Sequence, residues 1–186
     1  GNLRDIFTSR KRADVLLVTK SPVPLLNVAR QASINELQPN ANQPVLHSYL
    51  KYGDLIHLYH NESRTLESIK DFEIFLLTGI ANPAPLIEEL EKYAGNIKHE
   101  EFPDHYTFKN DDLKKFKAAF MASVKKDKII ITTEKDSKRL KAAGFKDLLV
   151  NLPVYYLPIE VELFEEDKIT FDELILNYVK SNRRNR

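Results

Sequence analysis

Three short, uninterrupted apolar runs constrain the fold of this chain more than any other feature. They lie at residues 15–18, 74–77 and 129–131. Strands that are buried on both faces read as continuous apolar runs, whereas half-buried strands alternate with polar residues. Segments with helical periodicity separate the runs, as they do in βαβ units. The sequence therefore predicts an α/β fold with a Rossmann-like, mostly parallel sheet and flanking helices.

One region departs from this pattern. Residues 45–51 and 55–59 flank Tyr52-Gly53-Asp54, which is typical of an antiparallel hairpin. We interpret residues 1–60 as an inter-domain strand, helix and hairpin segment, and residues 61–186 as a C-terminal Rossmann-like α/β domain; one compact domain overall is the alternative. Near the end, Thr170 and Glu173 have capping-box spacing and predict that the last helix begins there.

Composition narrows the possible functions. The formal net charge is +1, so no global field attracts nucleic acid, and we expect no nucleic-acid partner. There is no cysteine, which excludes thiolate chemistry and disulfides. His57 and His60 are three residues apart in a strand-like pattern, so we expect them to face opposite sides, and we assign no metal site. The chain begins with Gly1 rather than methionine, and we expect it to be a piece of a longer protein.

His105 is the first candidate for chemistry. It follows Asp104 in the stretch Phe102-Pro103-Asp104-His105-Tyr106-Thr107-Phe108, between a predicted strand and a predicted helix. Histidine exchanges protons near neutral pH, which suits a catalytic role. The alternative is a partly buried loop histidine bonded to a backbone carbonyl, with Asp104 as an ordinary turn residue.

A second candidate follows the strongest predicted strand, at Thr133-Glu134-Lys135-Asp136, with Arg139 one turn further along. Thr133 fits an N-cap with Asp136 at the third helical position. A helix N-terminus at the end of a strand also binds anions, and Lys135 would add positive charge. The two interpretations are compatible.

Three further residues are candidates for binding substrate or phosphate. Gly79 follows another apolar run and permits close approach of a ligand, and Asn82 lies in the same turn. Arg4 could clamp a phosphate. No phosphate loop of the form G-x-x-x-x-G-K-[ST] occurs, and no G-x-G-x-x-G or serine nucleophile motif accompanies these residues.

Four stretches in order resemble the C-terminal half of the tetraacyldisaccharide 4'-kinase family of the lipid A pathway. Gly1-Asn2-Leu3-Arg4-Asp5 is similar to that family's G-x-L-R-[ED], and Thr78-Gly79-Ile80-Ala81-Asn82-Pro83 to its A-G-I-x-N-P turn. The stretch from Phe102 to Phe108 is similar to F-x-D-H-[HY]-x-[FY], and Thr132 to Leu140 is similar to T-x-K-D-x-x-[RK]-[LF]. The resemblance covers most of the chain but omits the family's phosphate loop, catalytic aspartate and membrane-associating helix.

The resemblance implies a kinase that moves the ATP γ-phosphoryl group to the 4'-hydroxyl of a tetraacyldisaccharide 1-phosphate, with ATP and Mg²⁺ bound mainly by the missing N-terminal half. His105 would pair with an aspartate of that half, and Arg4 would lie near the acceptor. Asp104, Thr133, Glu134, Lys135, Asp136 and Arg139 carry over as motif positions without individual roles. Expected partners are the missing half, the lipid disaccharide and, through the missing half, the cytoplasmic face of the bacterial inner membrane.

We expect this chain alone to be inactive. The rival interpretation is a non-catalytic α/β module that binds a nucleotide or a phosphosugar in a pocket of its own. A stand-alone hydrolase using Asp104 and His105 is a third alternative, which the lack of a nucleophile or a metal set disfavours.

Overall fold

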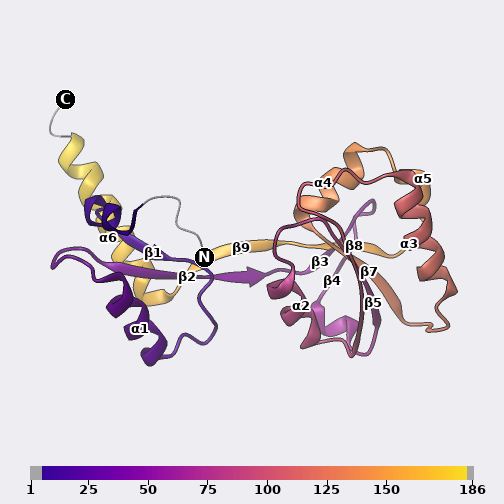
Figure 1. The fold of residues 1–186 in the computed structure, drawn as a ribbon, viewed down its shortest axis with the longest axis horizontal. Helices are drawn as coiled ribbons and strands as arrows, with labels where there is room; N and C mark the ends of the chain where they lie inside the picture. Colours follow the sequence, from indigo (N-terminus) through magenta and orange to yellow (C-terminus); the bar gives the residue numbers. More distant parts are fainter. Residues whose placement is uncertain (1–5, 184–186) are drawn as a thin grey trace. The chain divides into compact units, whose positions relative to one another are not determined.

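The computed structural model describes residues 6–183, which form two compact units (Figure 1). The first unit takes the chain up to Lys51 and again from Glu160 onward, and the second unit is Tyr52–Ile159. The chain thus leaves the first unit and later returns to it. This division differs from the boundary near residue 60 that we expected from the sequence.

The first unit is built on a three-stranded sheet with the order β1-β2-β9. Strands β1 and β2 pair in parallel, with Leu16 opposite Val45, and helix α1 connects them, so the segment is a single βαβ unit. The elements of this unit are η1 (Phe7–Arg12), β1 (Leu16–Val18), α1 (Asn27–Leu37), β2 (Val45–Tyr52), β9 (Ile159–Leu163) and α6 (Glu165–Arg183).

A buried carboxylate ties these elements together. The Oδ1 atom of Asp167, on α6, accepts a hydrogen bond from Arg30 of α1 at 2.8 Å, and its Oδ2 atom accepts one from the backbone N–H of His47 in β2 at 3.1 Å. The Nε2 atom of His47 lies 2.7 Å from the Ser33 hydroxyl of α1. One carboxylate therefore fixes α1 and α6 to the central strand.

The second unit contains a six-stranded sheet with the order β4-β3-β8-β7-β5-β6. Strands β8, β7, β5 and β6 are mutually parallel, and β3 is antiparallel to both β4 and β8. The strands are β3 (Leu55–His57), β4 (Ser63–Arg64), β5 (Glu73–Thr78), β6 (Asn96–Glu101), β7 (Lys128–Thr133) and β8 (Val154–Leu157). The other elements are η2 (Leu66–Ile69), α2 (Ala84–Glu91), α3 (Asn110–Ala122), α4 (Glu134–Ala142) and α5 (Lys146–Leu149).

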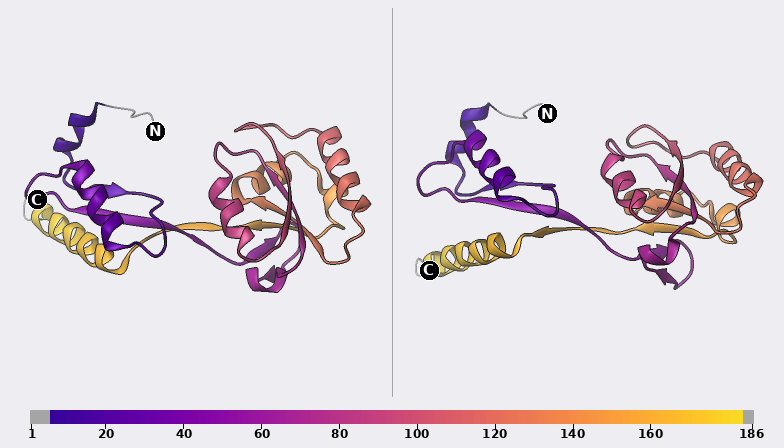
Figure 2. Two further views of the ribbon diagram at one scale, coloured as in Figure 1. Left: turned by 60° about the horizontal axis from the view of Figure 1, so that its bottom comes forward. Right: turned by 90° about the horizontal axis from the view of Figure 1, so that it is seen from below.

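Both faces of this sheet are buried, as the continuous apolar runs predicted. Every residue of β5 is buried. Ile74 and Leu76 pack with α2 and η2 on one face, whereas Phe75 and Leu77 pack with α3, α4 and α5 on the other. The views of Figure 2 show α2 and α3 on opposite sides of the sheet. The Rossmann-like parallel sheet with flanking helices is therefore confirmed.

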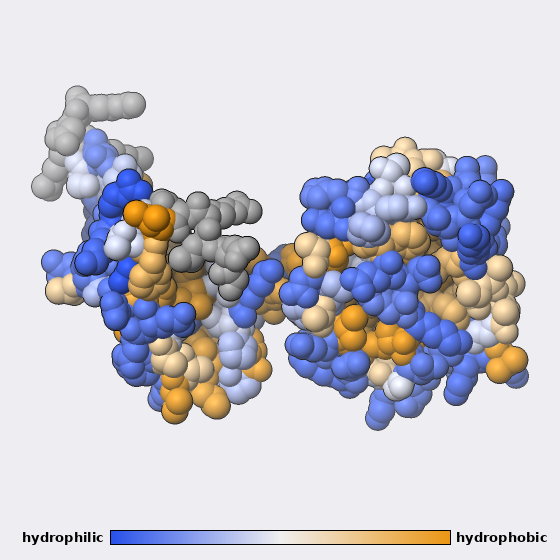
Figure 3. All heavy atoms as spheres, viewed as in Figure 1, coloured by the Kyte–Doolittle hydropathy of each residue, from blue (hydrophilic) through white to orange (hydrophobic). Residues whose placement is uncertain are grey.

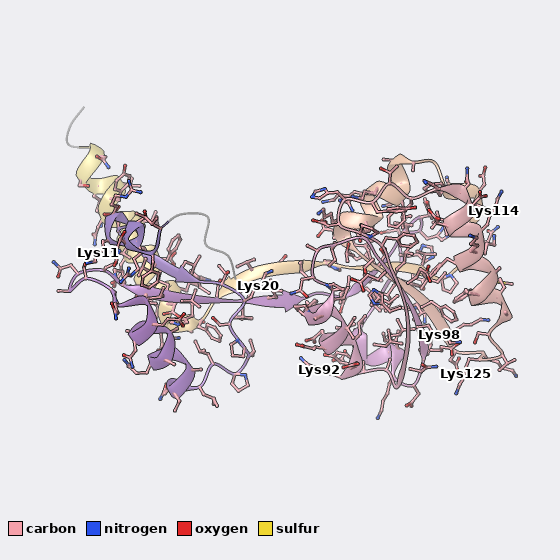
Figure 4. The ribbon with its side chains drawn as sticks, in the orientation of Figure 1. Lys11, Lys20, Lys92, Lys98, Lys114 and Lys125 are labelled. Atoms are coloured by element: carbon pink, nitrogen blue, oxygen red, sulfur yellow. The ribbon has the colours of Figure 1, made fainter. Side chains whose placement is uncertain are left out.

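Charged side chains lie on the outside of both units (Figure 3). Figure 4 labels six of the lysines, and Lys92 and Lys114 lie at the periphery of the second unit. At one end of the sheet, Lys98 of β6 pairs with the buried Glu73 of β5 at 2.9 Å. Within the described residues, no helix combines the length and the apolarity that crossing a bilayer requires.

The antiparallel excursion is present, but its strands are not those we expected. Residues 45–51 belong to β2, which pairs with β1 in the first unit, and residues 55–57 form β3, which pairs with β4 and β8. Gly53, which we predicted to turn a hairpin, instead donates its N–H to the Pro158 carbonyl at 3.1 Å. The turn-like residues mark the point where the chain passes from one unit to the other.

The last helix begins five residues earlier than its capping-box spacing predicted. It starts at Glu165, and its first turn carries Glu165, Glu166 and Asp167. Carboxylates stabilise the positive end of a helix, so these acidic residues suit a helix start. Thr170 lies inside the helix, where its hydroxyl donates to the Glu166 carbonyl at 3.2 Å.

We expected His57 and His60 to face opposite sides, but the structure places their rings next to each other. Their ring centroids are 4.6 Å apart, because β3 ends at His57 and a turn follows. In this turn, the Nδ1 atom of His57 accepts the N–H groups of Tyr59 and His60, each at 3.1 Å, and its Nε2 atom lies 3.2 Å from the Leu152 carbonyl. These contacts require a neutral imidazole with its hydrogen on Nε2.

Because His57 is buried and neutral, we expect acid to lower the stability of the second unit. Burial lowers the pKa of His57 below its usual value of 6.5, so its contribution to stability is complete above that value and is lost as the pH falls toward the lowered pKa. We expect the free energy of unfolding to fall between pH 7 and pH 5, and the fall to be smaller in His57→Asn, which retains an acceptor near the Nδ1 position. Urea titrations across this range test the prediction, and identical pH dependence in both proteins would contradict it.

Candidate functional site

The candidate site lies where the strand order of the second unit reverses. After β5 the chain passes through α2 to β6 on one side, and α3 then returns it to β7 on the other side of β5. Open α/β sheets bind their ligands at this switch point, beyond the carboxyl ends of the strands. Gly79 directly follows β5, Thr133 ends β7, and the 102–108 stretch follows β6. The motif residues of three separate segments therefore meet at one edge.

Thr133 is the N-cap of α4, as its spacing predicted. Its hydroxyl oxygen accepts the backbone N–H of Asp136 at 3.0 Å and donates its own hydrogen to the Asp136 carboxylate at 2.8 Å. The same carboxylate accepts the backbone N–H of Gly79 at 2.9 Å. Asp136 is fully buried. It therefore joins the start of α4 to the end of β5.

Arg139 completes this buried connection. Its Nη1 atom donates to the Asp136 Oδ1 atom at 2.8 Å and to the Gly79 carbonyl at 2.9 Å. Its Nη2 atom lies 3.2 Å from the Nδ1 atom of His105. The sequence placed Arg139 in a motif without a role, whereas the structure gives it contact with three of the other motif positions.

The 102–108 stretch forms a tight turn over this edge. Phe102 donates its N–H to the Thr78 carbonyl at 2.7 Å, and Tyr106 donates its N–H to the Pro103 carbonyl at 3.1 Å. The Phe102 and Tyr106 rings stack with their centroids 4.7 Å apart. His105 at the tip has φ of 63°, a left-handed conformation that is uncommon outside glycine. The stacked aromatic rings anchor the turn, and the His105 side chain at its tip is exposed.

His105 is exposed rather than partly buried. Its side chain is 74% exposed, and its ring contacts Arg139 and Asp104 rather than a backbone carbonyl. Asp104 accepts a hydrogen bond from Lys135 at 3.0 Å and one from the His105 backbone N–H at 3.0 Å. The hydrogen bond from the Lys135 ammonium holds the pKa of Asp104 below its usual value. The tip thus combines a fixed anion and an accessible imidazole beside two cations.

A shallow hollow of about 370 Å³ adjoins the imidazole. His105, Phe108 and Arg139 line it, together with the small side chains of Ala142 and Ala143. Its volume lies near the lower end of the range that small-molecule sites occupy.

Not every predicted residue joins the site. The Asn82 side chain accepts the Ala84 N–H at 3.2 Å and so caps the first turn of α2. Glu134 pairs with Lys138 at 2.8 Å on the surface of α4. Arg4 lies outside the described residues. Among residues 6–183, no group of three or more acidic or histidine side chains is arranged to hold a metal ion.

Gly79 lies where the three segments approach one another closely. A Cβ atom there would lie 3.3 Å from the Asp136 Oδ1 atom and 3.5 Å from both the Phe108 ring and the Pro103 carbonyl. We expect Gly79→Val to lower the free energy of unfolding by about 2 kcal/mol, since overpacking a filled site forces backbone shifts. A Cβ atom at Gly95 meets nothing within 4 Å, so Gly95→Val is the matched control. Urea titration compares the two, and equal losses would contradict the proposed close approach.

Comparison with known proteins decides the family. The family described as Tetraacyldisaccharide-1-P 4'-kinase matches residues 1–180. The chain belongs to the tetraacyldisaccharide 4'-kinase family. It is 34% identical over 187 residues to the tetraacyldisaccharide 4'-kinase of Phocaeicola vulgatus, covering 100% of this chain and 51% of that protein. It is also 34% identical over 188 residues to that of Flavobacterium psychrophilum, covering 100% of this chain and 50% of that protein.

A solved structure supports the fold. The crystal structure of the "apo" form of LpxK from Aquifex aeolicus in complex with ATP matches with a TM-score of 0.57 and 22% sequence identity. The match covers 95% of this chain and 46% of that one. The chain therefore spans about half the length of the tetraacyldisaccharide 4'-kinases that it matches.

Proposed function

We propose that the chain is the C-terminal portion of a kinase that transfers the ATP γ-phosphoryl group to the 4'-hydroxyl of a tetraacyldisaccharide 1-phosphate in lipid A biosynthesis. Family membership supports the reaction class. The observation that carries the site is the exposed imidazole of His105, which is held by Arg139 at the switch point of a parallel sheet. A catalytic group belongs where a second segment can reach it.

In this proposal the chain supplies an orienting histidine rather than a complete reaction centre. His105 pairs with an aspartate of the N-terminal half and tunes it as the base that accepts the proton of the acceptor hydroxyl. Asp104, which accepts hydrogen bonds from Lys135 and from the His105 backbone N–H, fixes the turn that carries the imidazole. Phosphoryl transfer depends mainly on positioning and on neutralising charge, so the cationic Lys135 and Arg139 suit the edge that faces anionic groups.

ATP and Mg²⁺ belong mainly to the half that is absent here. The chain lacks a phosphate loop, and the described residues lack a set of metal ligands. When bound, Mg²⁺ would neutralise the charge that develops on the transferred phosphoryl group. Asp104 is the carboxylate of this site that lies nearest the surface, but its Oδ1 atom already accepts both Lys135 and the His105 N–H.

The exposed apolar surface of the first unit fits contact with the N-terminal half of the longer kinase, here called the partner half. Among residues 6–183, all but three of the exposed large hydrophobic side chains lie in this unit, and the exceptions are Met121, Val124 and Ile159. Figure 3 shows such side chains reaching the surface of this unit. Parallel sheets are normally covered on both faces. The first unit contributes only a single βαβ unit and one further strand to its sheet. The polypeptide that forms the other half of the relatives fits as the cover, and through it the enzyme would associate with the inner membrane.

Phosphoryl transfer from labelled ATP to a tetraacyldisaccharide 1-phosphate tests the proposal. We expect a longer protein, in which the phosphate-loop half precedes residue 1, to form product, and the 186-residue chain alone to form none. Turnover by the chain alone would refute the proposed division of labour. Calorimetry of the chain with ATP and with a phosphosugar separates the rival, because tight binding by the chain alone would favour a self-contained binding module.

A further inference from the structure

Two basic side chains of α4 hold two consecutive residues of the turn above it. The Nζ atom of Lys135 lies 3.0 Å from the Asp104 Oδ1 atom, and the Nη2 atom of Arg139 lies 3.2 Å from the His105 Nδ1 atom. Residues four apart on a helix share a face. One face of α4 therefore holds both the Asp104 carboxylate and the His105 imidazole in position.

The Arg139 guanidinium is itself fixed by the protein. Its Nη1 atom donates to the Gly79 carbonyl and to Asp136, at 2.9 and 2.8 Å. Asp136 is fully buried and is held by the Gly79 N–H and the Thr133 hydroxyl. Only 22% of the Arg139 side chain is exposed. The Nη2 atom is therefore positioned by the ends of β5 and β7 rather than by solvent.

This contact determines which ring nitrogen of His105 carries the hydrogen. A guanidinium has donors only, so the Nδ1 atom must accept with its lone pair. A neutral imidazole that accepts at Nδ1 carries its hydrogen on Nε2. The Nε2 atom lies 3.5 Å from the Asp104 Oδ2 atom, beyond a short hydrogen bond, on a side chain that is 74% exposed. Its N–H is therefore available to an acceptor from another segment.

We propose that Arg139 is a positioning residue that fixes the tautomer of His105, so that Nε2–H is presented outward to a carboxylate acceptor. The acceptor is the aspartate of the partner half, and in that respect alone the inference rests on the proposed function. A histidine that is oriented on one nitrogen and works through the other is the arrangement that general acid–base sites require. Asp136 supports Arg139, and Lys135 supports the backbone of the turn through Asp104.

The ¹⁵N chemical shifts of the His105 ring, measured by NMR on the 186-residue chain at pH 8, test the inference directly. We expect the Nδ1 shift of an unprotonated nitrogen and the Nε2 shift of a protonated one. In Arg139→Ala both shifts should move toward the average of exchanging tautomers, and Arg139→Lys, which retains a donor, should restore them in part. Lys138→Gln on the same helix, which removes only a surface pair with Glu134, should leave both unchanged.

A hydrogen on Nδ1 in the wild-type chain, or unchanged shifts in Arg139→Ala, would overturn the inference.

In the longer protein, Arg139→Ala should lower kcat by about 10-fold with little change in KM, as expected when an interaction acts through the transition state. Arg139→Lys should recover part of the lost kcat. The two proposals fail separately. If the tautomer is fixed but replacing His105 leaves turnover unchanged, the proposed function is wrong while the role of Arg139 on the ring stands.

Discussion

Asp136→Ala should lower the free energy of unfolding by about 3 kcal/mol, because removing one partner of a buried ion pair leaves the other uncompensated. Asp136 is fully buried and accepts the Gly79 N–H, the Thr133 hydroxyl and the Arg139 guanidinium. Its loss leaves the Gly79 N–H and the Thr133 hydroxyl without this acceptor, whereas Arg139 keeps its bond to the Gly79 carbonyl. The Arg139 side chain is 22% exposed and regains some hydration, which places the expected value at the low end of the range for such pairs.

Urea titration of the chain, followed by circular dichroism, measures the loss as a shift in midpoint at constant slope. Hydrogen exchange of the β5 and β7 amides then assigns the loss to the second unit. Glu134→Gln on the first turn of the same helix is the control, since it removes only an exposed pair with Lys138 and should change stability by less than about 0.5 kcal/mol. A loss for Asp136→Ala no greater than that of the control would show that the carboxylate does not join the two strands.

Periodicity predicted the parallel core well, because burial on both faces leaves a direct signature. The runs at residues 74–77 and 129–131 became β5 and β7, and the Thr133 cap began α4 as expected. Local turn chemistry predicted less well. Tyr52-Gly53-Asp54 is turn-like, yet its neighbours pair with distant strands, since pairing is decided by long-range packing that a local pattern does not encode.

The sequence singled out the residues of the candidate site but did not indicate how they are arranged. Asp136 was expected at the third position of α4, and the spacing from Lys135 to Arg139 places both on one face of that helix. That Asp136 points inward to the Gly79 N–H, and that Arg139 reaches His105, depends on the order of strands β6, β5 and β7. Sequence spacing cannot supply that order, because the strands are adjacent in space and distant along the chain.

His105→Asn in the longer protein should lower kcat by about 100-fold or more, within the range of a positioned acid–base group. Asparagine tolerates the left-handed conformation at this position, where φ is 63°, so the turn should survive the change. It also lacks the imidazole ring. Because the His105 side chain is 74% exposed, we expect the free energy of unfolding to change by less than about 0.5 kcal/mol.

The most direct measurement is therefore kcat of His105→Asn beside that of the wild type and of Lys138→Gln, at saturating ATP and acceptor lipid. We predict a loss of about 100-fold or more for His105→Asn alone, with all three proteins equally stable. Turnover of His105→Asn within about twofold of the wild type would contradict the placement of this imidazole at the reaction centre.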